Sequence, residues 1–409
     1  MTNKKDANGT SSGAVSTARW QVAPEIPFNA EPVVSPLLFF SDNPENITSQ
    51  IMGTGRQGLV LWEQRVTGTG PRCSFRAFFW HVNGTDEPLV IGLTLRNLDT
   101  ESDLVVRRGS VSRTVDTRSG DYFKAGQRIA LESLGGTGEP FPDADLWLPA
   151  GEDGSDSGST VVLDQASLCP GDHFFACYEG TVERADGLVG PVSFELRSAT
   201  GRSNIVGDLA EVLPAEPAEG GDLYGHARGA WPYSRIRIEM VEPFCCTGGA
   251  QFARLRLAQR LSTSEGTPDV ELFREAAALP YGPERDQPMD GRWIKANKGL
   301  YGVDYDPVEI RVRNPLPVQR TIRVSVGTLT PGRTASGLVH GLVGAFDAGG
   351  ACIFPPAGSK PQYLCSAARD LFPILDLHAP ASGDATGSFR LQLGGASTLP
   401  WFVVLEERG

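Results

Sequence analysis

The stretch PLVIGLTLRN, from Pro88 to Asn97, indicates the kind of structure that this chain forms. Its odd-numbered side chains from Leu89 to Leu95 are all large and apolar. Successive side chains of a β-strand point to opposite faces, so apolar residues at every second position are typical of a strand with one buried face. We therefore predict a half-buried strand here.

A second stretch, PVEIRVRN from Pro307 to Asn314, has the same period. Val308, Ile310 and Val312 share one face, and charged side chains alternate with them. Proline lacks an amide donor, so Pro307 is expected at the start of a strand, at a bulge or at a sheet edge. This stretch also predicts a β-strand.

The two stretches resemble each other beyond their alternation. Each ends in Arg-Asn, passes through a polar turn and leads into a second strand that stops at a glycine, Gly109 in one case and Gly327 in the other. Two matching hairpins predict an internal duplication of the chain. Chance similarity between amphipathic strands is the alternative interpretation.

The composition agrees with many short strands joined by turns. The chain has 409 residues, with 48 Gly and 30 Pro, and its length suits two domains. Helical patterns are scarce, and the best one follows Thr267 and ends before Pro280. We predict an all-β protein made of two β-sandwich domains, either immunoglobulin-like or jelly-roll-like.

Changes in composition place the domain boundaries. Residues 1–30 lack hydrophobic periodicity and are expected to form a disordered N-terminal arm. Residues 31–212 are expected to form the first sandwich and residues 223–409 the second. Residues 213–222 are rich in Pro, Gly and Glu and are expected to be the linker between them.

The charge pattern excludes some partners. The net charge is −12 and no basic block occurs, so we expect no nucleic-acid partner. No run of eighteen apolar residues is present, so we expect no membrane insertion. The N-terminus has a Lys pair without an apolar segment behind it and does not read as a secretory signal peptide. On this ground alone, a cytoplasmic location stays open.

Motifs that carry chemistry are either missing or out of context. Gly53 to Gly58 fits G-x-G-x-x-G, but a strand-like segment follows where dinucleotide binding needs a helix. The sequence holds no phosphate-binding loop, no H-E-x-x-H and no paired C-x-x-C. His81 follows a run of aromatic residues and reads as a core or edge residue. We therefore assign no catalytic, cofactor-binding or metal-binding residue, and we expect the protein not to be an enzyme.

The seven cysteines allow two interpretations. An odd number cannot pair completely within one chain. The spacing from Cys169 to Cys177 could be bridged across a hairpin, as could that from Cys352 to Cys365. Buried free thiols are the other interpretation, because free cysteine packs like a small apolar side chain.

The segment from Tyr224 to Ser234 is the best candidate for a binding surface. His226, Arg228, Trp231 and Tyr233 could stack on a sugar ring or anchor a partner protein. The same residues could equally be packing at the start of the second domain.

A tight turn precedes the second strand stretch. Asn297 can bond downstream amides, and Gly299 and Gly302 flank Tyr301, so that the backbone can turn with positive φ while the ring covers one end of the sandwich. We interpret this segment as a structural turn and not as a ligand-holding loop.

Short pieces in chain order resemble a group of uncharacterised secreted bacterial proteins from cyanobacteria and Gram-positive bacteria. They are Ser41–Ile47 with Gly53, Phe78–Asn83, Leu95–Asn97, Gly225–Gly229, Asn297–Val303 and Gly394–Pro400. Asn297–Val303 is similar to the group's Asn-Lys-Gly-Asn-Tyr-Gly-Val, with Leu300 in place of the second Asn. The group carries a leader, and we expect none in this chain. The resemblance implies a β-rich protein of the cell surface or extracellular space and brings no catalytic residue.

Together these observations lead us to expect a structural or assembly protein of the bacterial envelope that acts through protein–protein contacts. Homo-oligomers or other envelope proteins are its expected partners. A carbohydrate-binding module with a glycan ligand is the alternative, and a hydrolase is a weaker one, because sites in β folds often assemble from distant loops.

Overall fold

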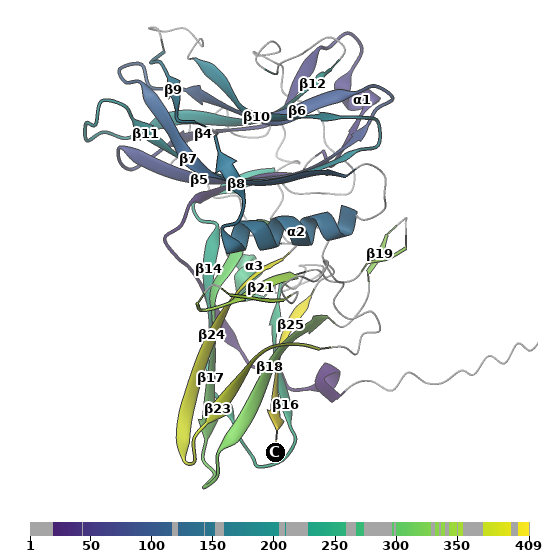
Figure 1. The fold of residues 1–409 in the computed structure, drawn as a ribbon, viewed down its shortest axis with the longest axis vertical. Helices are drawn as coiled ribbons and strands as arrows, with labels where there is room; N and C mark the ends of the chain where they lie inside the picture. The colour runs from purple at the N-terminus through teal and green to yellow at the C-terminus, as the bar shows by residue number, and fades with distance from the viewer. Residues whose placement is uncertain are drawn as a thin grey trace, which may run out of the picture.

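The computed structural model confirms an all-β architecture of two sandwiches, stacked one above the other in Figure 1. It describes residues 19–42, 44–116, 122–142, 144–151, 159–203, 209, 228–258, 267–273, 297, 300–328, 332–334, 337–339, 343–349, 351–354, 371–393 and 400–408. We call the upper sandwich of Figure 1 the first module and the lower one the second module.

The first module has a large sheet in the order β13-β2-β5-β11-β7-β8, which β3 and β9 extend, and a four-stranded sheet in the order β10-β6-β12-β4. The strands are β2 (Leu37–Ser41), β3 (Asn46–Thr48), β4 (Gly58–Thr67), β5 (Arg72–Gly84), β6 (Leu89–Asn97), β7 (Leu104–Asp116), β8 (Glu139–Phe141), β9 (Leu146–Leu148), β10 (Thr160–Leu168), β11 (His173–Arg184), β12 (Ser193–Arg202) and β13 (Arg228–Trp231).

The second module has a large sheet in the order β1-β14-β17-β24-β21-β22, which β15 extends, and a four-stranded sheet in the order β16-β25-β18-β23. The strands are β1 (Phe28–Pro32), β14 (Arg235–Met240), β15 (Phe244–Cys245), β16 (Phe252–Leu257), β17 (Asp304–Asn314), β18 (Arg320–Thr328), β21 (Val343–Asp347), β22 (Cys352–Phe354), β23 (Phe372–Ala379), β24 (Gly383–Leu393) and β25 (Trp401–Arg408). The strands β19 (Gly332–Thr334) and β20 (Gly337–Val339) pair with each other.

The two modules have the same topology, and it is that of a jelly roll. In the first, β4-β12-β6-β10 faces β5-β11-β7-β8; in the second, β16-β25-β18-β23 faces β17-β24-β21-β22. Neighbouring strands within each set of four run antiparallel, and only β7–β8 and β21–β22 are consecutive in the chain, as in an eight-stranded jelly roll. Even the parallel pairs match, because β2 and β3 lie along β5 as β14 and β15 lie along β17.

Two buried asparagines occupy equivalent places in this repeat. Asn83 is the second-to-last residue of β5, and Asn314 is the last residue of β17. In each case the side-chain amide donates to the carbonyl four residues later and to the last residue of β10 or β23, while Oδ1 accepts from the backbone amide two residues later. The equivalent bonds show that the repeat extends to individual turns.

The hairpins that the sequence suggested as copies are not the equivalent ones. The resemblance of Asn97 to Asn314 predicts that β6 matches β17, whereas the topology matches β5 with β17 and β6 with β18. Asn97 misleads because it caps the end of β6 with the same kind of bonds, from its side-chain amide to nearby carbonyls and from the amide two residues later to its Oδ1. Similar turn chemistry therefore recurs at strands that are not equivalent.

The N-terminal region differs from the expected arm. Residues 1–18 lie outside the described part, but η1 (Arg19–Val22) and β1 are regular structure. Trp20 is buried against Phe402 with ring centroids 6.1 Å apart, and β1 pairs with β14 of the second module. Two large apolar side chains, Trp20 and Phe28, hold this segment in place because both are buried and their burial removes apolar surface from water.

The expected boundary between domains also differs from the observed one. Residues 213–222 lie outside the described part of the chain. Strand β13, which follows them, belongs to the large sheet of the first module, and β1 belongs to that of the second. Each module therefore takes its outermost strand from the segment that precedes the other module.

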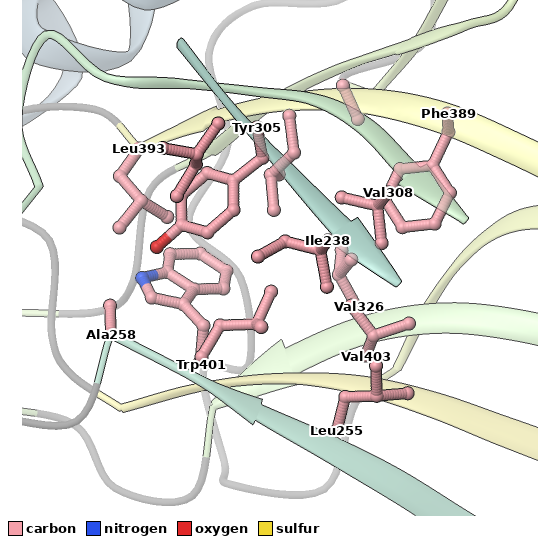
Figure 2. Close-up of a cluster of buried hydrophobic side chains, with 14 of the residues drawn as sticks. Ile238, Leu255, Ala258, Tyr305, Val308, Val326, Phe389, Leu393, Trp401 and Val403 are labelled. Carbon is pink, nitrogen blue, oxygen red and sulfur yellow. The ribbon is translucent and has the colours of Figure 1, made fainter. Parts of the chain in front are cut away.

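The alternating patterns explain the cores. Val308, Ile310 and Val312 are buried as predicted, and Pro307 falls at a break in the register of β17. Figure 2 shows side chains of both sheets of the second module meeting around Tyr305 and Trp401. Strand β6 is buried on both faces, not on one as predicted, because Val90 packs with Ala199 and Leu209 on its second face.

A 14-residue helix, α2 (Tyr122–Gly135), was not evident from the sequence. It lies between the modules and contacts β7 and β11 of the first and β21 and β24 of the second (Figure 1). Within the described residues the helix predicted after Thr267 is the short α3 (Pro268–Glu271), and the rest of that prediction lies outside them; α1 (Ser49–Met52) is equally short.

Candidate functional site

The junction between the modules gathers most of the residues that the sequence singled out. It is an apolar cluster that continues from the large sheet of the first module, through α2, into the core of the second. Phe40, Phe78, Trp80 and Phe175 supply the first module's side, and Ile129 supplies that of α2. The outer face of this sheet is thus covered by the second module.

The aromatic residues proposed as a binding surface are packed into this junction. Trp231 is fully buried, with its ring centroid 6.0 Å from that of Phe273. Tyr233 packs against the same Phe273 at 5.2 Å, and its hydroxyl donates to the carbonyl of Leu272 at 2.8 Å. A sugar stacks on an exposed ring face, so Trp231 does not offer a glycan platform.

Arg228 faces a different environment. Its Nη1 donates to the carbonyl of Leu61 at 2.9 Å, and its guanidinium lies 5.4 Å from the ring centroid of Trp62. Burial lowers the pKa of the Arg228 guanidinium to about 10. His226 lies outside the described residues. Arg228 and Trp231 therefore do not form one surface.

The turn after Asn297 is the part of the second module that covers the junction. The side-chain amide of Asn297 donates to the carbonyl of Tyr301 at 2.9 Å, and its Oδ1 accepts from the Tyr301 amide at 3.1 Å. Leu300 and Gly302 both have positive φ, 50° and 75°. Tyr301 lies against Phe40 of the first module, with ring centroids 6.5 Å apart. Gly299 is outside the described residues.

Leu300 adopts a backbone conformation that is unusual for its residue type. Its φ of 50° is in the left-handed region, which Asn tolerates better than Leu. Leu300 is nevertheless fully buried in the junction cluster. Apolar burial therefore holds this side chain in a backbone conformation that its type disfavours.

A buried arginine, Arg76, ties the two modules together. It is 1% exposed on β5, and its Nη2 donates to Asp304 Oδ2 at 2.8 Å, while Nη1 donates to the carbonyl of Gly302 at 3.0 Å. Its Nε also donates to Glu179 at 2.8 Å. Burial alone would lower the pKa of Arg76, but the carboxylates of Asp304 and Glu179 outweigh it and raise that pKa well above its ordinary value. Arg76 therefore stays charged inside the junction.

Arg76 was missed in the sequence, although a signal was there. It interrupts the apolar run Phe75–Phe79 on a strand, and a charge inside such a run is rarely buried unless it is paired. Its partner Asp304 lies 228 residues away, so no local pattern could have identified the pair.

A serine and a histidine meet inside the first module. Ser41 Oγ lies 3.0 Å from His81 Nε2 and 2.9 Å from Ser198 Oγ, while His81 Nδ1 donates to the carbonyl of Pro44 at 2.9 Å. This is hydrogen-bond geometry of the kind that activates nucleophiles. All three side chains are fully buried, however, so a substrate does not reach them. We interpret the network as polar packing of the core.

Five cysteines are free thiols: Cys73, Cys169, Cys177, Cys245 and Cys246. Cys169 and Cys177 do not form the hairpin disulfide that their spacing allowed. Cys365 lies outside the described residues, and the predicted pairing of Cys352 with it lies outside them too. Burial raises the pKa of the Cys177 thiol to about 12, and its Sγ lies 3.4 Å from Ser133 Oγ of α2. Such a thiol is unreactive and acts as packing.

The described residues offer little else for chemistry. They contain no group of three or more His, Cys, Asp or Glu that could hold a metal ion. A pocket of about 310 Å³ lies among Glu25–Phe28, Arg256 and Thr267–Pro268. Its Glu25 carboxylate is already held by Arg254 and Arg256. The segment at Gly53–Gly58 leads into strand β4 and not into a helix.

No helix among the described residues has the length and apolar character needed to cross a lipid bilayer. Comparison with known proteins finds no matching family and no matching curated protein.

Proposed function

We propose that this chain is a non-enzymatic assembly subunit of the bacterial cell surface or envelope, acting through protein–protein contacts. The observation that carries the proposal is the way in which the chain joins its own modules. Each completes the other's large sheet with a strand, β1 in one direction and β13 in the other. Strand addition is a general mode of protein recognition.

The junction supports the same function. A binding protein with a mobile cleft would leave its interdomain surface polar, as transient interfaces are. Here the surface between the modules is an apolar cluster, and the buried ion pair of Arg76 with Asp304 joins the two sides, which suits a rigid building block. Jelly rolls occur in capsid and lectin domains, an analogy of fold that fits both an assembly subunit and a glycan binder. The burial of Trp231 favours the first.

The location rests on the resemblance to secreted bacterial proteins, and the partners follow from it. Copies of the chain, or other envelope proteins, are the partners that strand addition and a rigid junction fit.

Imaging and glycan screening together test the proposal. Negative-stain imaging of the purified chain at high concentration is expected to show ordered oligomers, sheets or filaments, and a glycan array is expected to retain none of it. Single particles of one chain, with glycan retention that Tyr233→Ala abolishes, would instead establish a carbohydrate-binding module. Tyr233 suits this variant because, unlike Trp231, it is only partly buried.

A further inference from the structure

The exchange of strands between the modules is reciprocal. Strand β1 precedes β2 in the chain but pairs with β14, from Phe28 opposite Met240 to Pro32 opposite Ile236. Strand β13 precedes β14 but pairs with β2, from Arg228 opposite Ser41 to Trp231 opposite Leu38. Since β2 and β14 are equivalent in the repeat, β1 and β13 are equivalent too. Each module lends the other the same strand.

The two connecting segments meet where the strands change modules. Residues 33–36 join β1 to β2, and residues 232–234 join β13 to β14. The Val33 amide donates to the Arg235 carbonyl at 3.1 Å, and the Ser234 amide donates to Ser35 Oγ at 3.1 Å. This is the arrangement that a strand-exchanged dimer would have if its two subunits were fused into one chain.

The accepting sites are specific for these strands. Phe28 is buried in the junction cluster, and Trp231 is buried with it. Asn29 and Glu31 of β1 point outward and are exposed. A second copy of the chain carries the same β1 and β13, so it fits both sites with the same register and the same buried side chains.

We propose that two copies of the chain exchange these strands with each other: β1 of one pairs with β14 of the second, and β13 of the second pairs with β2 of the first. The proposal rests on the assembly function proposed above and names its route. The junction then forms between chains, with Arg76 of one copy bound to Asp304 of the other, and every strand pair is retained. Exchange of identical elements is a low-cost route to dimers because it replaces contacts with the same contacts.

The chain is long enough for this route. Only the connection between Arg202, at the end of β12, and Arg228, at the start of β13, has to run from one pair of modules to the other. Leu209 within it packs with Val90 of the first module, so 18 residues (210–227) can make the crossing, and they span up to roughly 60 Å when extended. The same length serves the single chain and the exchanged dimer.

Paired cysteines test the exchange. Asn29 and Glu239 lie directly opposite each other in the β1–β14 pair, where the Cα separation suits a disulfide. A chain carrying both Asn29→Cys and Glu239→Cys is expected to cross-link within itself as a monomer, which checks the pairing and the folding of the variant. Asn29→Cys and Glu239→Cys chains mixed at high concentration and then oxidised are expected to cross-link only in dimers that hold one chain of each kind.

The matched control pairs Asn29→Cys with Arg237→Cys. Arg237 lies on the same strand but opposite Glu31, so this mixture is expected to give no cross-link. Oligomers that form without the Asn29–Glu239 cross-link would overturn the exchange and leave the assembly function standing. Absence of both oligomer and cross-link would overturn the two together. Failure of the double variant to cross-link within the monomer would overturn the strand pairing itself.

Discussion

Removal of Arg76 is expected to weaken the whole chain and not one module. Arg76→Met keeps most of the side-chain volume but removes the hydrogen-bonded charge partner of Asp304, which is fully buried and then keeps only Arg235, whose Nε lies 3.8 Å from Asp304 Oδ2. Removing one partner of a buried ion pair costs about 3–5 kcal/mol. The Gly302 carbonyl also loses its donor, and an unsatisfied buried acceptor costs about 1–3 kcal/mol. Glu179 is partly exposed and can regain water.

Urea unfolding followed by far-UV circular dichroism measures this loss, and two further variants make it decisive. Arg72→Met, four residues earlier on β5, removes the exposed ion pair with Glu183 and is expected to cost at most about 1 kcal/mol. Arg76→Met combined with Asp304→Leu removes both charges and is expected to recover most of the stability. If Arg76→Met lowers the free energy of unfolding no more than Arg72→Met does, Arg76 does not stabilise the junction.

The remaining predictions concern turns and use the same unfolding assay. Gly302→Ala forces a Cβ into a crowded left-handed position and is expected to cost about 1–3 kcal/mol; Gly55→Ala, with a similar φ and open space, should cost less, and equal losses would contradict the crowding. Leu300→Asn relieves backbone strain but is expected to lose about 2 kcal/mol net, because a buried Leu contributes about 1.5–3 kcal/mol; increased stability would show that strain dominates. Asn83→Ala and Asn314→Ala are expected to cost about 2 kcal/mol each and nearly the same amount, and clearly unequal losses would contradict their equivalence.

Alternation predicted the strands well because it reports how each strand meets its own core. Val308, Ile310 and Val312 are an example, and Pro307 sits at the irregularity that its missing amide requires. Alternation does not report which strand lies beside which. The sequence could therefore suggest a duplication and still match Asn97, instead of Asn83, with Asn314.

The exchanged strands were beyond reach for the same reason. Phe28–Pro32 is a short edge strand of the large sheet of the second module and contains a proline. Its sequence pattern therefore differs little from that of a loop. Helix α2 was missed because its apolar face serves two modules at once and its sequence lacks a clear capping signal. Both elements are fixed by tertiary contacts more than by local preference.

The sequence pointed to residues that do lie at an interface, but it did not show that Trp231 is buried there. Trp231 and Tyr233 do mark an interface, but it is internal and contains Phe273. The turn at Asn297 was interpreted as structural, and the structure places Tyr301 against the first module. Exposure depends on the packing of distant segments, which composition and spacing do not encode.

Light scattering coupled to size-exclusion chromatography, over a wide range of protein concentrations, tests the assembly function most directly. If the chain assembles, its mass rises from that of one chain, 43.8 kDa, to that of a dimer or a higher multiple as concentration increases. A constant mass of 43.8 kDa at every concentration would contradict the assembly function.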